Sequence, residues 1–280
     1  MMRDRYCVVG RDVSHSPSPA MMNAAFRAAK VDAAYTRVSI PEPRFPREFR
    51  RLMASGFKGM NVTIPYKTAV IRMLAGTDAV ATRTNAVNTV KAEEDGSYTG
   101  HNTDPDGIVG ALGGLQWSLD VRNALLIGAG GAARAFCEAM NRIGCLDIGV
   151  AVRDTSRASR FVVEMEKAYP KMNLTLAPLD DLRHLNHDLV FNASPMGAKG
   201  EPLPKELKRI LPGSKIAFDA VYRPRITRLL AEAKRQGCKV VFGEDMLLHQ
   251  GMAAFSIWTG KEAPGAVMKK ALSSARSGKR

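Results

Sequence analysis

The chain has 280 residues, enough for two domains of ordinary size that each bury a hydrophobic core. Hydrophobic residues make up 45% of it and charged residues 24%, and no stretch is of low complexity, so the composition is that of a globular protein. No apolar run approaches the roughly 18 residues of a membrane span, and the first residues lack a signal-peptide core. These features predict a cytoplasmic protein.

Basic residues outnumber acidic ones by 41 to 27, which gives a net charge of +14. Such an excess suits either nucleic acid or an anionic small ligand. The basic residues are spread along the whole sequence with few aromatic residues between them, and only the end of the chain, KKALSSARSGKR, is locally enriched. We expect that tail to be a solvated, frayed terminus, and we expect neither nucleic acid nor a membrane as a partner.

The cysteines are scattered without C-x-x-C spacing, at positions Cys7, Cys137, Cys145 and Cys238. Isolated cysteines of this kind behave as small buried hydrophobic residues in a reducing compartment. We therefore expect neither a disulfide framework nor a metal site.

Short apolar runs alternate with amphipathic stretches, which predicts parallel sheets covered by helices on both faces. In the first part we expect strands at 6–10, 33–40 and 59–64, and helices at 19–30, 46–55 and 66–75. Turn residues then crowd at 100–114. A second series follows, with strands at 123–128, 147–152, 188–192, 215–221 and 238–243, helices from 131, at 155–168 and at 224–237, and a helical end from Asp245. Two α/β units that meet near residue 108 account for this order.

The entry to the first helix is unusually polar: SHSPSP, residues 14–19. Ser18 is a good N-cap, with Pro19 at the first helical position. That explains one serine and leaves Ser16 and His15 without a purpose. Because Ser16 and Ser18 lie two apart in what reads as an extended segment, we expect their hydroxyls to share a face, about 6.6 Å apart along the chain.

Polar side chains also gather where several predicted strands end. They are Asn61, Thr63 and Lys67 in GMNVTIPYK, Asn88 and Thr89 in NAVNTV, and Asn102, Thr103 and Asp104 in GHNTDPDG. Taken alone, Lys67 on a first helical turn is typical of a solvated surface charge, and Asp104 before a proline is typical of a helix cap. Open α/β sheets bind ligands at the carboxyl ends of their strands, so together these residues suit a polyhydroxylated ligand. A lysine–aspartate pair would supply a proton donor and its electrostatic partner.

The sequence NALLIGAGGAARAF places a glycine-rich turn between an apolar strand and a helix. Gly128 permits the tight turn, Gly130 lets a pyrophosphate approach the backbone, and Ala133 allows close packing of helix on strand. The helix N-terminus then faces the phosphates. With a second strand about 20 residues on, this pattern predicts a dinucleotide site.

The end of that second strand, VAVRDTSRA, bears on the choice of cofactor. NAD enzymes usually place an acid there and NADP enzymes a cation. Arg153 and Arg157 could clamp a 2′-phosphate, whereas Asp154 could repel it or merely pair with an arginine. The residues favour NADP and leave NAD open.

Eight stretches in order resemble shikimate dehydrogenases over nearly the whole length. They are SHSPSP, GMNVTIPYK, NAVNT, GHNTDPDG, GAGGAARA, DLVFNASPMG, DAVYRPRITRLL and GEDMLLHQGMAAFSIWTG. The resemblance implies an enzyme of aromatic amino acid biosynthesis that reduces 3-dehydroshikimate to shikimate with NADPH. It implies an N-terminal three-layer α/β substrate-binding catalytic domain (1–108), an NADP-binding Rossmann-type doubly wound parallel sheet (109–245), and C-terminal helices that pack back on the first domain (246–280).

The resemblance also assigns roles to single residues. Lys67, as general acid/base, and Asp104 form the catalytic pair, and Ser16 and Ser18 hold the substrate carboxylate. The substrate hydroxyls and ring fall to Thr63, Asn88, Tyr222 and Gln250. The cofactor site comprises Gly128, Ala129, Gly130, Gly131, Ala132, Arg153, Arg157, Ala220, Gly243 and Met246.

The chain departs from the family pattern at several positions. Asp12 stands where proline is common, Met22 replaces a histidine, Asn85 replaces the glycine of GAVNT, and Val152 and Asp154 depart from an Asn-Arg-Thr clamp. Asparagine tolerates positive φ, so the change at Asn85 should be structurally quiet.

Three alternatives stay open beside a shikimate dehydrogenase. The first is an NAD-dependent quinate or aminoshikimate dehydrogenase; quinate enzymes often carry threonine at the second serine, so Ser18 favours shikimate. The second is a non-catalytic shikimate-sensing regulator, which the intact Lys67 and Asp104 disfavour. The third is a nucleic-acid binder, suggested by charge alone. A homodimer is an open expectation for the assembly.

Overall fold

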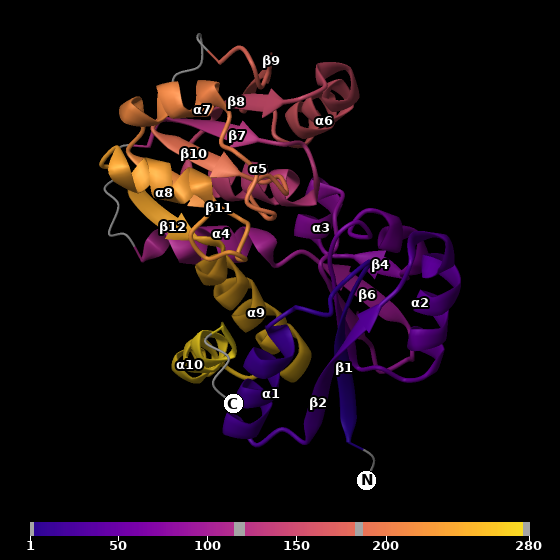
Figure 1. Cartoon of the computed structure of the whole chain (residues 1–280). Helices are drawn as coiled ribbons and strands as arrows, with labels where there is room; N and C mark the ends of the chain where they lie inside the picture. Colours follow the sequence, from indigo (N-terminus) through magenta and orange to yellow (C-terminus); the bar gives the residue numbers. More distant parts are fainter. Residues whose placement is uncertain (1–2, 115–120, 183–186, 277–280) are drawn as a thin grey trace. The chain divides into compact units, whose positions relative to one another are not determined.

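The computed structural model describes residues 3–114, 121–182 and 187–276, which form two compact units (Figure 1). The described residues up to Thr103 and from Leu248 onward make up the first, here called the N-terminal unit. Residues Asp104–Leu247 make up the second, the central unit. Each has its own six-stranded sheet, which confirms the predicted α/β class.

The sheet of the N-terminal unit has the order β2-β1-β3-β5-β6-β4. Its strands are β1 (Asp4–Gly10), β2 (Ala33–Ser39), β3 (Gly59–Val62), β4 (Gly76–Thr77), β5 (Thr89–Ala92) and β6 (Tyr98–His101). β1 pairs in parallel with β2 and β3, as predicted, but β5 is antiparallel to both β3 and β6. The prediction of a purely parallel sheet was wrong here, because a short turn joins β5 to β6 and such a turn suffices only for antiparallel strands.

The helical elements of the first hundred residues are α1 (Ser18–Ala28), η1 (Glu42–Arg44), α2 (Phe45–Ala54), η2 (Ala69–Met73) and α3 (Ala79–Thr84). The helix expected at 66–75 is only the short 3₁₀ helix η2. The N–H of Val87 donates to the carbonyl of Lys67 at 2.8 Å. That carbonyl is therefore bound to a neighbouring segment and not to a helical turn of its own.

The end of the chain is helical, as α9 (Gly243–Thr259) and α10 (Gly265–Arg276). α10 packs against α1 and buries Met268 and Leu272, so residues 269–276 are helical and not the frayed tail we expected. The rest of that predicted tail, 277–280, lies outside the described residues. The indole N–H of Trp258 in α9 donates to the carbonyl of Val90 at 3.0 Å. A Cβ at Gly59 would collide with that indole, which explains a glycine at the start of β3.

The central unit has an all-parallel sheet of order β12-β11-β10-β7-β8-β9. Its strands are β7 (Asn123–Ile127), β8 (Asp147–Val152), β9 (Asn173–Pro178), β10 (Leu189–Asn192), β11 (Ile216–Asp219) and β12 (Lys239–Phe242). Strand order reverses between β7 and β10, and open α/β sheets bind ligands at such a switch point, beyond the carboxyl ends of the strands. Of these strands, β9 was not predicted from the sequence.

Helices cover both faces of the central sheet, as its alternating side chains show. They are α4 (Asp104–Gly113), α5 (Gly131–Ile143), α6 (Thr155–Ala168), α7 (Lys205–Ile210), the short η3 (Leu211–Gly213) and α8 (Arg228–Arg235). Leu126 and Phe191 face the core under α4, α5 and α6, where the rings of Phe136 and Phe191 stack with centroids 4.5 Å apart. Leu125 and Val190 face the core under α7 and α8. This doubly wound arrangement confirms the predicted Rossmann-type class.

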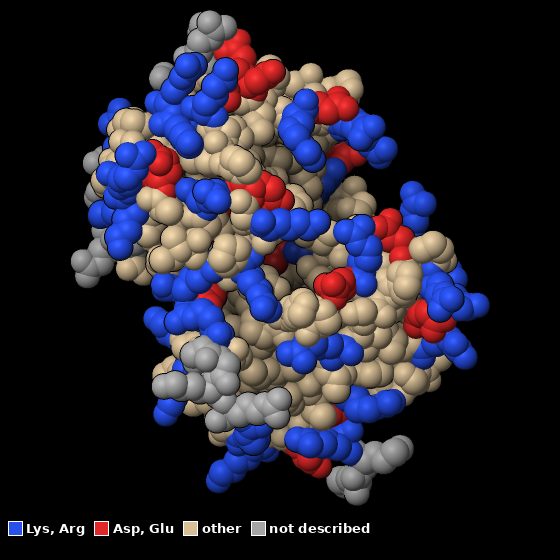
Figure 2. All heavy atoms as spheres, viewed as in Figure 1, with Lys and Arg blue, Asp and Glu red and all other residues tan. Residues whose placement is uncertain are grey.

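Surface charge is mixed. Over the face seen in Figure 2, the coloured Lys and Arg side chains are interspersed with Asp and Glu and form no continuous basic stripe. Among the described residues, no helix is both long and apolar enough to cross a membrane.

Candidate active site

Ser16 and Ser18 meet at the start of α1. Ser16 Oγ donates to Ser18 Oγ at 3.1 Å, and both residues are buried. The segment is a turn and not an extended strand, so the two hydroxyls are closer than the predicted spacing. The N-cap of α1 is Pro17, with Ser18 the first helical residue, so the prediction that Ser18 is the N-cap was off by one. The hydroxyl of Ser18 is therefore not used in capping.

Two side chains hold this turn in place. Arg37 of β2 donates to the carbonyl of Ser16 twice, from Nε at 2.8 Å and from Nη2 at 2.6 Å. Asp12 accepts from the N–H and the hydroxyl of Ser14 at 3.1 and 2.7 Å, and these two bonds close the turn. Position 12 is the one at which shikimate dehydrogenases commonly have proline. Arg37 was not predicted from the sequence, because its partner lies 21 residues away on another element.

Asn88 is the centre of a buried polar network in the N-terminal unit. Its Oδ1 accepts from the N–H of Thr103 at 2.8 Å and from Thr89 Oγ1 at 2.9 Å. Its Nδ2 donates to Thr103 Oγ1 at 3.0 Å and to Gln250 Oε1 at 3.4 Å. Asn88 and Gln250 were both predicted to bind the ligand, and the fold brings them together from positions 162 residues apart.

Asn61 belongs to the same network but acts as a cross-brace. It accepts from Tyr35 Oη at 2.6 Å and donates to Thr89 Oγ1 at 3.1 Å and to the carbonyl of Asn88 at 3.2 Å. Asn102 similarly donates to Thr84 Oγ1 at 3.0 Å. Both amides therefore tie strands and α3 to one another.

Lys67 lies in the turn between β3 and η2, half-buried, and not on a helix. Its carbonyl is bound to Val87, one residue before Asn88. Thr63, also half-buried, follows β3 directly, and its N–H donates to the carbonyl of Val9 at 2.9 Å. These main-chain bonds place Lys67 and Thr63 beyond the end of β3, on the side of the sheet where Asn88 precedes β5.

Asp104 is the residue that follows Thr103 of this network. It is the first residue of α4 and is buried, with 4% exposure. Asp104 therefore stands at a helix start, as the helix-cap interpretation expects, and its burial shields the carboxylate from water. Asn85, the αL residue that ends α3, has φ 46°, which confirms that asparagine fits the position of the family's glycine.

In the central unit, the glycine-rich turn follows β7 and opens α5 as predicted. Gly128 has φ +102°, and Ala133 is fully buried against the sheet. A Cβ on Gly130 would meet nothing within 4 Å. Together with the first-turn N–H groups of α5, which have no partner within the helix, this opening fits a pyrophosphate.

The strand-end residues of β8 resolve the ambiguity at Asp154. Its carboxylate is the N-cap of α6, accepts from the N–H groups of Ser156 and Arg157 at 3.1 and 3.2 Å, and pairs with Arg157 Nε at 3.1 Å. The hydrogen bond from the Ser156 hydroxyl, the largest contribution, and these contacts together lower the pKa of the Asp154 carboxyl. Arg153 is exposed and has no ion pair with any described residue. Asp154 thus pairs with an arginine, and the side chain of Arg153 remains exposed.

The other predicted cofactor residues surround the end of β11. A Cβ on Gly243 would lie 2.6 Å from the carbonyl oxygen of Ala220, so a glycine is needed where the two segments meet. Tyr222, half-buried, lies two residues further along the same loop. Met246 is buried in the core under α4 and α5.

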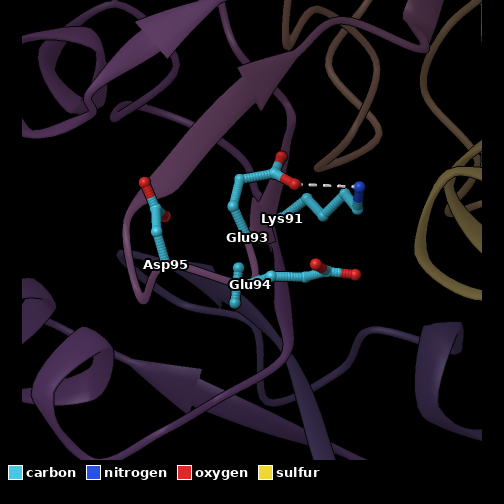
Figure 3. Close-up of a pocket in the computed structure, with 5 residues that line it drawn as sticks. Lys91, Glu93, Glu94 and Asp95 are labelled. Atoms are coloured by element: carbon cyan, nitrogen blue, oxygen red, sulfur yellow. Dashed lines mark hydrogen bonds and ion pairs between the residues drawn. The ribbon is translucent and has the colours of Figure 1, made fainter.

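A pocket on the β5–β6 turn contains none of the predicted site residues (Figure 3). It is lined by Lys91, Glu93, Glu94, Asp95 and Ala92, and Lys91 Nζ pairs with Glu93 at 3.0 Å. Three carboxylates around one ammonium give a negative surface, which disfavours an anionic ligand. We therefore assign no substrate to it.

Comparison with known proteins gives consistent matches over most of the chain. Residues 8–90 match the family model of the shikimate dehydrogenase substrate binding domain, and residues 243–272 match that of the shikimate 5'-dehydrogenase C-terminal domain. The NADP(+) shikimate dehydrogenase of Moorella thermoacetica is 38% identical, over 95% of this chain and 91% of that protein.

Two solved structures share the fold over nearly the full length. Shikimate 5-dehydrogenase of Thermus thermophilus, in complex with NADP(H) and shikimate, has a TM-score of 0.84 and 34% identity over 97% of this chain and 99% of that one. Quinate dehydrogenase of Corynebacterium glutamicum, in complex with NAD, has a TM-score of 0.86 and 29% identity, with 97% and 99% coverage. On sequence and structure alike, the chain belongs to the shikimate dehydrogenase family.

Proposed function

We propose that this protein catalyses the reversible, NADP-dependent reduction of 3-dehydroshikimate to shikimate. The observation that carries the proposal is the turn at Gly128–Gly131, shaped for a pyrophosphate, in a chain of this family. The N-terminal unit adds the buried hydroxyl pair of Ser16 and Ser18 and the amides of Asn88 and Gln250. Hydroxyl and amide groups in this number suit a small acid with several hydroxyls.

The substrate roles follow from these side chains. Ser16 and Ser18 would bind the carboxylate, helped by the dipole of α1, whose N-terminus they occupy. Thr63, Asn88, Tyr222 and Gln250 would bind the hydroxyls and the ring. Met246 and the contact pair Ala220 and Gly243 would take the cofactor beside the glycine-rich turn.

The cofactor, when bound, supplies the hydride that reduces the ketone. Lys67 would give a proton from Nζ to the oxygen that gains negative charge, and would take it back in the reverse direction. Asp104 would orient the ammonium and bind a ring hydroxyl. Its burial supports this role, because a carboxylate shielded from water interacts more strongly with a nearby cation.

The arginines at the end of β8 support NADP over NAD. Arg153 is available to the 2′-phosphate, while the carboxylate of Asp154 is bound by the α6 N-terminus and by Arg157. A carboxylate occupied in this way repels a phosphate less than a free one. The cytoplasmic location is part of the same proposal, supported by the free, buried state of all four cysteines. A homodimer stays a prediction.

A second candidate is an NAD-dependent quinate dehydrogenase, favoured by the similarity to the quinate enzyme. Initial rates with shikimate or quinate, each with NADP+ or NAD+, separate the two. The rates are measured from the absorbance of the reduced nicotinamide. We expect the highest kcat/KM with shikimate and NADP+. A preference for quinate with NAD+ would reverse the assignment, and no turnover with any pair would favour a sensor.

A further inference from the structure

Asp219 is a buried carboxylate with no role in the reaction described above. It ends β11, is 0% exposed, and is surrounded by three donors. Thr227 Oγ1 donates to its Oδ2 at 2.6 Å, and Asn192 Nδ2 and the N–H of Val221 donate to its Oδ1 at 2.9 and 3.0 Å. Burial raises the pKa of Asp219 to about 6, although the three bonds act in the other direction. Asp219 therefore joins the segments that follow β10 and β11.

Asn192 extends the link from Asp219 into the next loop. It ends β10, the neighbour of β11, and is 0% exposed. Besides its bond to Asp219, Nδ2 donates to the carbonyl of Met196 at 3.0 Å. Its Oδ1 accepts from the N–H and the hydroxyl of Ser194 at 3.1 and 2.7 Å. The segment 193–196 is thus wound around one amide, whose orientation Asp219 fixes because a carboxylate accepts only from the NH₂ side.

Ser194 in turn lies against the glycine-rich turn. A Cβ on Gly128 would be 3.3 Å from Ser194 Cβ and 3.4 Å from its main-chain nitrogen. Gly128 has φ +102°, a conformation that glycine adopts freely and leaves as freely. Neighbouring atoms packed on one side of such a residue restrict its backbone conformation. Ser194 supplies these atoms, here called the wall beside Gly128.

We propose that Asp219 is a positioning residue for the cofactor: through Asn192 and Ser194 it fixes the wall that holds Gly128 and the turn it begins. The inference rests on the proposed function, which assigns NADP to that turn. Preorganised backbone groups bind a phosphate more tightly, because the ordering cost is met in folding and not on binding.

The test is the Kd of NADP+, measured by isothermal titration calorimetry. Asp219→Ala removes the acceptor for Asn192, Val221 and Thr227 and should raise Kd about tenfold, the size of one charge-assisted bond. Asp219→Asn keeps an oxygen that accepts from Asn192 and Val221, so Kd should stay within about threefold. Glu138→Gln is the matched control: Glu138 is equally buried and bonds Tyr169 and Arg142, away from these loops. Its Kd should not change.

Asn192→Ala provides a second route and covers the case in which Asp219→Ala does not fold. It should raise Kd to the same extent, and the double variant should be no worse than either single one, since both break one chain of contacts. An unchanged Kd in both variants, additive effects, or an equal effect of Glu138→Gln would overturn the proposal.

Hydrogen exchange of the cofactor-free protein separates this inference from the proposed function. In Asp219→Ala, amides of 128–131 and 192–197 should exchange several times faster than in the wild type, while those of β9 should not. Wild-type protein that fails to bind NADP+ contradicts the proposed function alone. Unchanged exchange at 128–131 contradicts the positioning role.

Discussion

The guanidinium of Arg37 grips the carbonyl of Ser16 with two hydrogen bonds, 2.8 Å from Nε and 2.6 Å from Nη2. The bonds run from the exposed edge strand β2 to the turn that presents the paired hydroxyls of Ser16 and Ser18. A fork of two parallel N–H donors fixes direction as well as distance. Arg37 therefore sets the orientation of the proposed carboxylate site from outside it.

We expect Arg37→Ala to raise KM for shikimate about tenfold, with a smaller change in kcat, because the turn loses its charged brace. Arg27→Ala is the control, since it removes an exposed positive charge from the last turn of α1. Steady-state kinetics at fixed ionic strength give KM for shikimate in both variants. Equal effects of the two variants would mean that net charge, and not the grip on Ser16, governs KM.

Lys67→Ala should lower kcat by roughly 10²–10⁴-fold, the loss expected for a general acid. Lys58→Ala, an exposed lysine just before β3, should retain wild-type kcat. Rates are measured with saturating shikimate and NADP+. A near-normal kcat in the Lys67 variant would remove it from the mechanism.

Arg153→Ala should raise KM for NADP+ about tenfold or more and leave KM for NAD+ within about twofold, since only NADP+ carries the 2′-phosphate. Arg157→Ala should have the smaller effect, because Arg157 is already paired with Asp154. Kinetics with each cofactor in turn provide the comparison. A larger effect at Arg157 would transfer the phosphate contact to that residue.

The raised pKa of Asp219 gives stability a definite pH dependence. Burial lifts it from 3.8 to about 6, so between these values the folded protein binds more protons than the unfolded chain. Stability contributed by this group is present below the lower value and falls as pH rises through the window, by roughly 3 kcal/mol. The difference in unfolding free energy between wild type and Asp219→Asn, from urea titrations, should decline from about pH 4 to about pH 6 and then level off. A difference independent of pH would exclude the shift.

Asn85 offers a test of backbone conformation. Its φ of 46° costs other side chains more than asparagine, so Asn85→Ala should destabilise the protein by about 1 kcal/mol. Asn85→Gly should be close to neutral. Thermal unfolding measures both, and an alanine variant as stable as the glycine variant would show that the αL conformation is not maintained.

Local patterns in the sequence were enough for much of the fold. Alternation of apolar and amphipathic runs predicted β1, β7 and β8 and the helix from Gly131, because burial and backbone preference act within a few residues. The glycine-rich turn and the left-handed Asn85 were predictable for the same reason. The antiparallel β5–β6 pair and the short η2 were not predictable, because they depend on which segments become neighbours in the fold. The bond from Val87 to the carbonyl of Lys67, just before η2, is one such contact.

What the sequence by itself determined is the set of chemical groups: hydroxyls, amides, one lysine and a glycine turn, in segments whose order marks the family. Only the tertiary structure decided their partners. Arg37 with Ser16, Asn88 with Gln250 and Asp219 with Asn192 lie 21, 162 and 27 residues apart. The physical reason is that a hydrogen bond needs a donor and an acceptor within about 3 Å, and strand order and register, not local preference, bring distant residues that close.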